Sequence, residues 1–143
     1  MGTAPVAKMV IQSRLSEAPE VHKPLLAQVA EHGYSPEAVF AIRLALDEAL
    51  TNAIRHGNCN DPSKQVVVEW SVTDRQVRIS VTDEGCGFCP GELPDPTTEE
   101  NLTRPCGRGV MLMQAYMNDV KFNKRGNKVT MTRKRDAPAP ARQ

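Results

Sequence analysis

The most unusual polar pattern in the chain is a row of side chains on a predicted helix, roughly across that helix from its apolar stripe. Glu48, Asn52 and His56 recur every four residues, so a helix places them on one face. Asn is a mediocre helix former because its side chain competes for the backbone, so an Asn in mid-helix needs a reason. The row fits either a solvated helix surface, the simpler interpretation of the helix alone, or a cluster of binding and catalytic groups.

Two glycine-rich segments follow, and each has a plain and a functional interpretation. Asp83 stands at the end of a predicted strand, with Gly85 and Gly87 just after it. This pattern fits a turn, or a place where the backbone approaches a flat ligand that donates a hydrogen bond to Asp83. Gly107-Arg108-Gly109, followed by Val110, precedes a predicted helix, and such an entry suits phosphate. The segment matches neither the Walker loop nor the dinucleotide fingerprint.

The elements that must position these groups can be read from periodicity. The helical periodicity predicts helices over residues 17–33, 35–57 and 110–117, the first with a boundary or kink near Lys23 because Pro24 follows. Ser35 and Pro36 suit the cap and first position of the second helix. Strand-like patterns cover residues 8–15, 65–73, 77–82, 120–123 and 128–133, the last four as two hairpins.

These elements predict one α+β domain over residues 1–135, a two-layer sandwich with helices on one face of a mixed, mostly antiparallel sheet. The Gly- and Pro-rich stretch from Asp83 to Gly109 is typical of a functional loop or lid. Residues 136–143 contain Ala-Pro repeats and are expected to be a disordered tail.

Composition excludes several classes of partner. Lys and Arg number 18 against 17 Asp and Glu, so charge gives no reason to expect nucleic acid or an anionic membrane as partner. No apolar run approaches the ~20 residues of a membrane span, and no signal peptide is visible, so a cytoplasmic location is expected. Cys86 and Cys89 form a C-x-x-C pattern without a second pair, so free thiols are favoured over a metal site.

The three polar segments together resemble a known superfamily. The segment 48–57, Glu-Ala-Leu-Thr-Asn-Ala-Ile-Arg-His-Gly, resembles the N box of the GHKL ATPases, which have the Bergerat ATP-binding fold. Asp83-x-Gly85-x-Gly87-Phe88 is similar to the first glycine box of these ATPases, and residues 107–113 are similar to the second. The likeness extends over about residues 8–135 and, within the superfamily, is strongest to the short bacterial anti-sigma-factor serine kinases.

The resemblance implies a role for each matching residue. Asn52 would bind the Mg²⁺ that bridges the ATP phosphates, and Asp83 would read the adenine amino group. Gly85 and Gly87 would shape the adenine pocket. Gly107 and Gly109, with Arg108 and Val110 in the same box, would hinge a lid over the phosphates. Glu48 would be the general base toward a serine hydroxyl. Many relatives carry a Thr in the last hairpin, where this chain has Asn127 or Lys128, with Thr130 close by.

The resemblance also implies a function and its partners. It implies a homodimeric serine/threonine protein kinase that sequesters a sigma factor and phosphorylates a small STAS-type antagonist protein. The alternative is a nucleotide-binding interaction module that inhibits a partner without turning over ATP.

Overall fold

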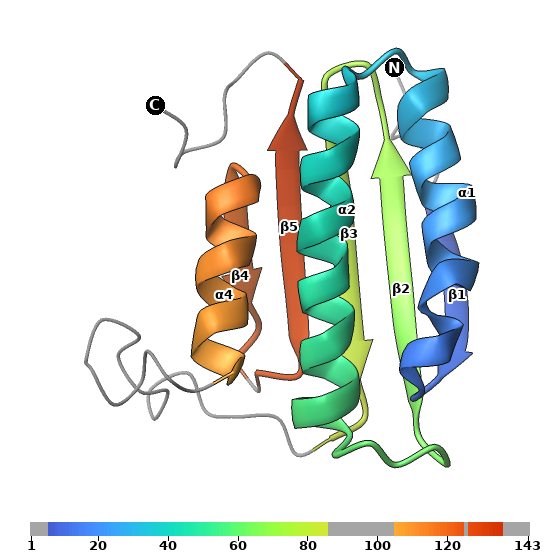
Figure 1. Cartoon of the computed structure of the whole chain (residues 1–143), viewed down its shortest axis with the longest axis vertical. Helices are drawn as coiled ribbons and strands as arrows, with labels where there is room; N and C mark the ends of the chain where they lie inside the picture. The colour runs from blue at the N-terminus through green and yellow to red at the C-terminus, as the bar shows by residue number, and fades with distance from the viewer. Residues whose placement is uncertain (1–5, 86–104, 125, 136–143) are drawn as a thin grey trace.

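The computed structural model describes residues 6–85, 105–124 and 126–135, with the backbone alone for residues 105–109. The predictions for Gly87, the Cys86 and Cys89 pair and the tail at 136–143 lie outside these residues. The elements run in the order β1 (Ala7–Gln12), η1 (Leu15–Glu17), α1 (Ala18–Glu31), α2 (Pro36–Thr51), η2 (Asn52–Gly57), β2 (Gln65–Val72), β3 (Gln76–Asp83), α4 (Pro105–Tyr116), β4 (Asp119–Phe122) and β5 (Lys128–Lys134) (Figure 1).

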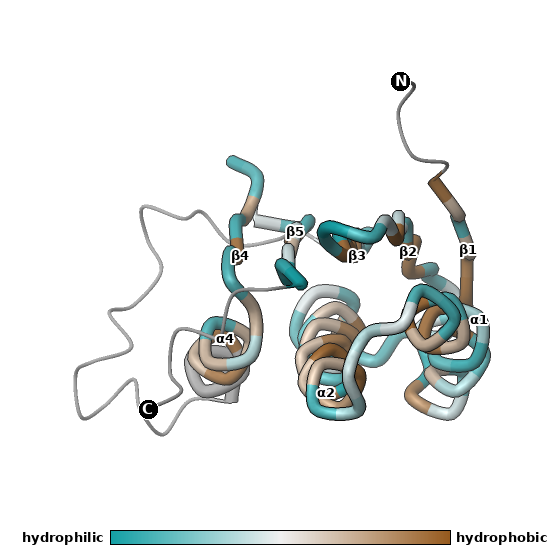
Figure 2. The backbone as a smooth tube through the Cα atoms, turned by 90° about the horizontal axis from the view of Figure 1, so that it is seen from above, coloured by the Kyte–Doolittle hydropathy of each residue, from teal (hydrophilic) through white to brown (hydrophobic). Residues whose placement is uncertain are grey.

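The described strands form one five-stranded sheet in the order β1-β2-β3-β5-β4, and all of its pairings are antiparallel. Seen from above, α1, α2 and α4 lie in a row along one face of this sheet (Figure 2). Both predicted hairpins are present, β2 with β3 and β4 with β5. The predicted α+β two-layer architecture is therefore confirmed.

The core lies between the helices and the inward side chains of the strands. Val68 of β2 pairs with Val81 of β3, which pairs with Val129 of β5, and all three are buried. Their neighbours along each strand face the other side of the sheet, because side chains alternate along a strand. This alternation fixes which residues near the strand ends can reach the helix layer.

The first helix is continuous through Pro24, so it has no boundary near Lys23, and the alternative of a kink there stays a prediction. A proline in a helix interior costs about 3 kcal/mol or more. Against that cost, α1 buries Val21, Leu25 and Val29 completely, and each such side chain contributes about 1.5–3 kcal/mol. The helix ends at Glu31, and Gly33 follows two residues later with a φ of +81°, which favours glycine, as the predicted cap requires.

The second helix begins as predicted but does not stay regular. The Ser35 side chain accepts a hydrogen bond from the Ala38 amide at 3.1 Å, and Pro36 takes the first helical position. From Asn52 to Gly57, however, the chain continues as a π-helix, η2. Such wide turns are rare and are frequently found at functional sites, so this departure from the expected helix marks the region for attention.

The last helix begins five residues earlier than expected, at Pro105 rather than Val110. The backbone of Gly107, Arg108 and Gly109 therefore lies inside α4, and the prediction that these residues precede the helix is wrong. Pro105 suits a first helical position, and the helix is held by the buried Met113, which outweighs the poor helix propensity of two glycines.

Candidate functional site

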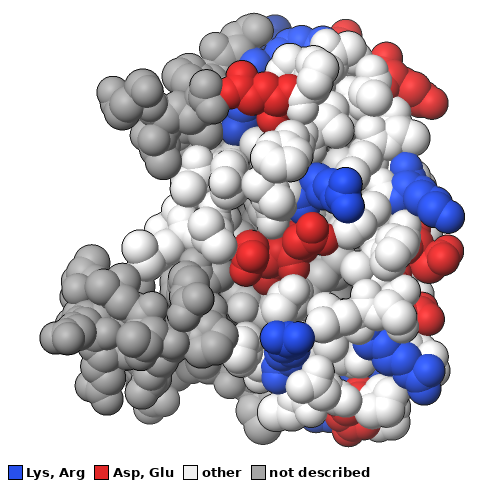
Figure 3. Space-filling model, viewed as in Figure 1, with Lys and Arg blue, Asp and Glu red and all other residues white. Residues whose placement is uncertain are grey.

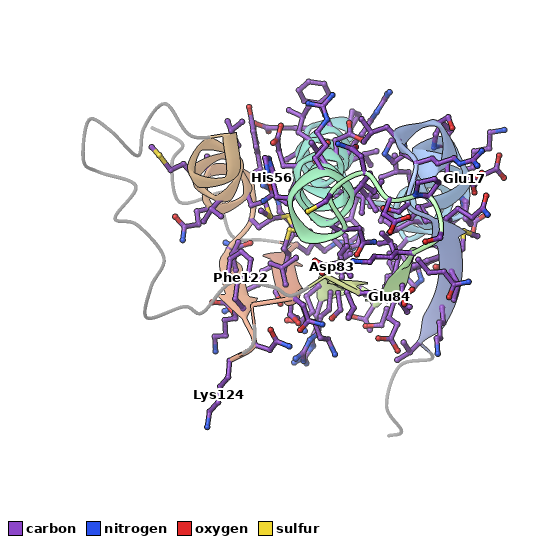
Figure 4. The ribbon with its side chains drawn as sticks, turned by 90° about the horizontal axis from the view of Figure 1, so that it is seen from below. Glu17, His56, Asp83, Glu84, Phe122 and Lys124 are labelled. Carbon is purple, nitrogen blue, oxygen red and sulfur yellow. The ribbon has the colours of Figure 1, made fainter. Side chains whose placement is uncertain are left out.

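A hollow lies where η2 meets the end of β3 and the start of β5. Its volume is about 40 Å³, and it is partly open to solvent. Its described lining residues are Ala49, Asn52, Ala53, His56, Gly57, Val81, Asp83, Phe122, Gly126, Asn127, Lys128 and Val129. His56, Asp83 and Phe122 can be followed around this region in Figure 4. Two predicted site residues, Asn52 and Asp83, thus come from segments 31 positions apart and meet in one cavity.

Asn52 stands at the junction of two kinds of helix. It is the C-cap residue of α2 and the first residue of the π-helix. Its backbone N–H donates to the carbonyls of Ala49 and Glu48. Asn52 is half-buried, and His56, although exposed, lines the cavity with it. Glu48 is half-buried one turn earlier and is not among the described lining residues. The polar row is therefore not a plain solvated surface, but only two of its three members line the cavity.

Asp83 is held rigidly at the last position of β3. Its side chain is buried, with 9% exposure, and Oδ1 accepts a hydrogen bond from the Gly85 amide at 2.9 Å. Its own amide donates to the Asn127 carbonyl at 2.9 Å, and the Asn127 side chain donates to the Asp83 carbonyl at 3.0 Å. The carboxylate is therefore a fixed acceptor in the wall of the cavity.

The glycines around Asp83 serve a close approach of two chain segments. A Cβ on Gly57 would overlap the Asp83 carboxylate, and a Cβ on Gly85 would overlap the Gly57 carbonyl. The missing side chain of Gly85 thus faces η2, whereas the sequence suggested that it faces a ligand. The sequence predicts only a helix end at Gly57, because its contact with Asp83 arises from the tertiary fold.

The last hairpin supplies the far wall of the cavity. Gly126, Asn127, Lys128 and Val129 line it, and Thr130 does not. Thr130 faces the opposite side of the sheet, where its hydroxyl lies 3.1 Å from that of Ser80. Of the three residues that could correspond to the Thr of many relatives, Asn127 and Lys128 line the cavity and Thr130 does not. The alternation around the buried Val129 and Met131 was the sequence signal that could have excluded Thr130.

The lining of this cavity does not place the second glycine segment. No residue of α4 belongs to the described lining, and Val110 is half-buried against the core. For Gly107, Arg108 and Gly109 the structure gives the backbone course only. The predicted grouping of this segment with Asn52 and Asp83 stays a prediction.

Among the described lining residues of the cavity, the charged ones are Asp83 and Lys128. On the helix-covered face, basic and acidic side chains are interspersed (Figure 3). Within the described residues no group of three or more His, Cys, Asp or Glu side chains could hold a metal ion. The chemical character of the site is instead a mixture of apolar walls with one buried carboxylate and several amides.

Asp74 and Asp61, whose pKa values are shifted clearly, both lie outside the cavity. A hydrogen bond from His32 and the charge of that ring lower the pKa of Asp74 below its ordinary value. Hydrogen bonds from the hydroxyl and amide of Ser63 lower the pKa of Asp61. Both carboxylates are exposed, so these shifts belong to surface contacts.

The family of the chain follows from comparison with known proteins. Residues 11–133 match the family of histidine kinase-like ATPase domains. The chain belongs to this family, as the GHKL resemblance predicted.

Within this family, the chain is similar to anti-sigma F factors and to a serine-protein kinase. The chain is 34% identical to an anti-sigma F factor of Geobacillus sp. (strain WCH70) over 107 residues, 73% of each chain. It is 32% identical to an anti-sigma F factor of Clostridium perfringens (strain SM101 / Type A) over 114 residues, 76% of this chain and 81% of the relative. It is 27% identical to the serine-protein kinase RsbW of Listeria innocua over 111 residues, 71% of this chain and 69% of the relative.

The fold is also shared with a solved structure, that of the RsbU and RsbW domains of Rv1364c from Mycobacterium tuberculosis. The TM-score is 0.63 at 22% identity, over 99% of this chain and 35% of that one. This chain therefore spans about a third of the larger protein, and the likeness concerns the fold. Among the described residues, no helix combines the length and apolar character that a bilayer crossing requires.

Proposed function

We propose that the chain binds Mg-ATP in the cavity between η2 and the ends of β3 and β5. The observation that carries this proposal is the convergence of Asn52 and Asp83, from separate segments, on one partly open cavity. Asp83 offers a fixed acceptor for the adenine amino group. The cavity walls suit a flat base, because they are largely apolar: Ala49, Ala53, Val81, Phe122 and Val129.

Asn52 is the residue proposed to hold the magnesium ion. Mg²⁺ usually takes one or two protein oxygens together with phosphate oxygens and waters, so it needs no cluster of carboxylates. The amide oxygen of Asn52, which lines the cavity from the first residue of η2, fits this requirement. The bound ion would neutralise charge on the phosphates during transfer.

The second glycine box keeps its proposed place at the phosphates. Because α4 begins at Pro105, Gly107 is its third residue and belongs to the first turn, and Arg108 and Gly109 follow in the next turn. The first amides of a helix have no partner within the helix and carry the positive end of its dipole, which suits a phosphate group. Gly85, which seats β3 against η2, and Gly87 are proposed to form the adenine end of the same site.

Glu48 is proposed to be the general base of a protein serine kinase. It precedes Asn52 by one helical turn, on the same helix. The acceptor hydroxyl would give its proton to the Glu48 carboxylate as its oxygen bonds to the γ-phosphorus, and ADP would leave with the electrons of the broken bond.

The named relatives support the biological role that we propose. Two are anti-sigma F factors and one is a serine-protein kinase. In this role the chain is a cytoplasmic homodimer that sequesters a sigma factor, and it phosphorylates a STAS-type antagonist protein so that the antagonist no longer displaces the sigma factor.

One observation favours a second candidate. Glu48 is not among the described lining residues of the cavity, so the base and the nucleotide pocket are not a single preformed unit there. A nucleotide-binding module that inhibits its partner without phosphoryl transfer would need Asn52 and Asp83 but no base.

The two candidates are separated by phosphoryl transfer. The protein is mixed with Mg-ATP labelled in the γ-phosphate and with candidate STAS-type proteins from the same genome. The kinase proposal expects label on one candidate, and a loss of about 10²–10⁴-fold in the transfer rate for Glu48→Gln, with ATP binding retained. Transfer by Glu48→Gln at the wild-type rate would remove Glu48 from the mechanism. ATP binding without transfer to any candidate would favour the binding module.

A further inference from the structure

Asn58 is a buried polar residue with no place in the predicted site. It follows η2 directly, and its exposure is 0%. Its backbone amide donates to the Ala53 carbonyl at 2.8 Å, which closes the last wide turn of the π-helix. Buried polar side chains are costly unless they are hydrogen-bonded, so the partners of this amide show what it holds together.

The side chain of Asn58 joins three strands. Its Nδ2 donates to the Ser13 hydroxyl at 3.1 Å, just beyond β1, and to the Gln65 carbonyl at 3.0 Å, at the start of β2. Its Oδ1 accepts from the Glu84 amide at 2.8 Å, just beyond β3. Both hydrogens of the side-chain amide and its oxygen are therefore used.

Asn58 contacts Glu84, which lies between the proposed adenine acceptor, Asp83, and the residue whose amide holds its carboxylate, Gly85. Asp83 precedes Glu84, and Gly85, whose amide donates to the Asp83 carboxylate, follows it. Asp83 and Glu84 are labelled at the end of β3 in Figure 4. On the other side of the contact, Gly57 precedes Asn58 and packs against the same carboxylate. Asn58 thus bonds η2 to β3 where the two segments meet without intervening side chains.

We propose that Asn58 is a positioning residue for adenine recognition, which holds the Asp83–Gly85 segment against the helix end that carries Asn52. This inference rests on the proposed nucleotide function of the cavity. It assigns to Asn58 an effect on the adenine-dependent part of binding. The Mg²⁺-dependent part belongs to Asn52, six residues earlier, at the other end of η2.

The test is equilibrium binding of ATP, ADP and GTP to Asn58→Ala, at a temperature where circular dichroism shows the variant folded. ATP and ADP should each bind about tenfold more weakly, the equivalent of about 1.4 kcal/mol. Binding of GTP should change less than twofold, so the preference for ATP over GTP narrows. A purely structural role predicts equal loss for all three nucleotides, and a folded variant with wild-type ATP binding and preference would also overturn the proposal.

Two further variants complete the test: Glu84→Ala is the control, and Ser13→Ala replaces Asn58→Ala if that variant does not fold. Glu84→Ala removes the bond from the Gln65 amide to the Glu84 carboxylate, 2.6 Å in the structure, but leaves the Glu84 amide on Asn58. Its ATP affinity should match that of the wild type. If Asn58→Ala does not fold, Ser13→Ala removes one of the bonds that orient the Asn58 amide. It should then weaken ATP about twofold to threefold and leave GTP unchanged, and equal loss for both nucleotides, or loss for neither, would contradict the proposal.

Amide hydrogen exchange separates this inference from the proposed function. In Asn58→Ala, or in Ser13→Ala if the first variant does not fold, the Glu84 and Gly85 amides should exchange faster than in Glu84→Ala and the wild type. Unchanged exchange at both amides would sink the positioning role even if the wild type binds ATP. Faster exchange in a protein whose wild type binds no nucleotide would keep the positioning of Asp83 and remove ATP as the ligand.

Discussion

The two ends of the sheet are built differently. At the lower end in Figure 1, η2, the end of β3 and the start of β5 are joined by buried hydrogen bonds and by glycines, and they enclose a cavity. At the upper end, the α1–α2 turn, the β2–β3 turn and the end of β5 are joined by larger side chains. Arg135 stacks 4.4 Å from the centre of the Tyr34 ring, and the Tyr34 hydroxyl donates to the Thr73 carbonyl at 2.7 Å.

The difference separates binding from stability. Side chains fill the space at the upper end, so its contacts close the sandwich. At the lower end, Gly85 packs on the backbone of Gly57, and Gly57 lies in the cavity wall directly against the fixed Asp83 carboxylate. We therefore expect substitutions at the lower end to change ligand binding and equivalent substitutions at the upper end to change the free energy of unfolding alone.

Asn52→Ala should give the largest effect. The Mg²⁺-dependent gain in ATP affinity should fall by about 100-fold, because the proposed protein ligand of the ion is lost, and this corresponds to about 2.7 kcal/mol. The free energy of unfolding without nucleotide should change little, since the side chain is half-buried and Ala is the better helix former. Titration calorimetry with and without Mg²⁺ measures the first quantity, and urea unfolding measures the second. A gain from Mg²⁺ equal to that of the wild type would contradict the assignment.

A matched pair of glycine substitutions compares the two ends directly. Gly85→Ala introduces a Cβ that overlaps the Gly57 carbonyl, so it should cost about 1–3 kcal/mol of unfolding free energy and also weaken ATP binding. Gly33→Ala, at a φ of +81° in the upper end, should cost about 1–2 kcal/mol and leave ATP binding unchanged. Equal effects of both changes on ATP affinity would break the comparison.

Arg135→Ala tests the upper end alone. The side chain donates to the Asp74 carbonyl at 3.1 Å and to the His32 carbonyl, and it stacks on Tyr34. Losing these partly exposed contacts should lower the free energy of unfolding by about 1 kcal/mol. Urea unfolding checks this value, and a change of more than threefold in ATP affinity would show that the two ends are coupled.

The smallest effect is expected at Asp74, and it depends on pH. His32 lowers the pKa of Asp74, so the folded state has the lower pKa and the contact stabilises the fold above the ordinary value of 3.8. That contribution is lost as the pH falls through the folded-state pKa. The stability difference between the wild type and Asp74→Asn should therefore shrink below about pH 4. A difference that grows as the pH falls below about 4 would reverse the assigned sign.

Periodicity and caps were sufficient for most of the fold. Features that depend on neighbours in sequence can be predicted from the sequence alone. These are the Ser35 cap, the buried stripe of α2 and the alternation of β2 and β3. Pro24 does not end the first helix, because the burial of α1 against the core outweighs the local effect of the proline. The early start of α4 was missed because two glycines hide a helix that is held by tertiary packing.

In the candidate site, too, some features could be predicted from the sequence and others depend on the tertiary fold. Asn52 and Asp83 could be singled out by residue type and motif. The contact of Gly57 with Asp83 and the three-strand role of Asn58 could not, because they depend on which backbone atoms meet across 26 positions of sequence. Thr130 could have been excluded from strand alternation, whereas Asn127 at the cavity depends on the hairpin turn that presents it.

The most direct test of the central claim is the effect of Mg-ATP on thermal unfolding of the wild type and of Asp83→Asn. If Asp83 reads the adenine, ATP at about 100 times its wild-type Kd should stabilise the wild type by ~2.7 kcal/mol, a shift of several degrees. The same concentration of ATP should give Asp83→Asn little or no shift, and GTP at this concentration should shift the wild type less than ATP does. An equal ATP shift in both proteins would show that the nucleotide does not depend on this carboxylate, and the account of the cavity would fail.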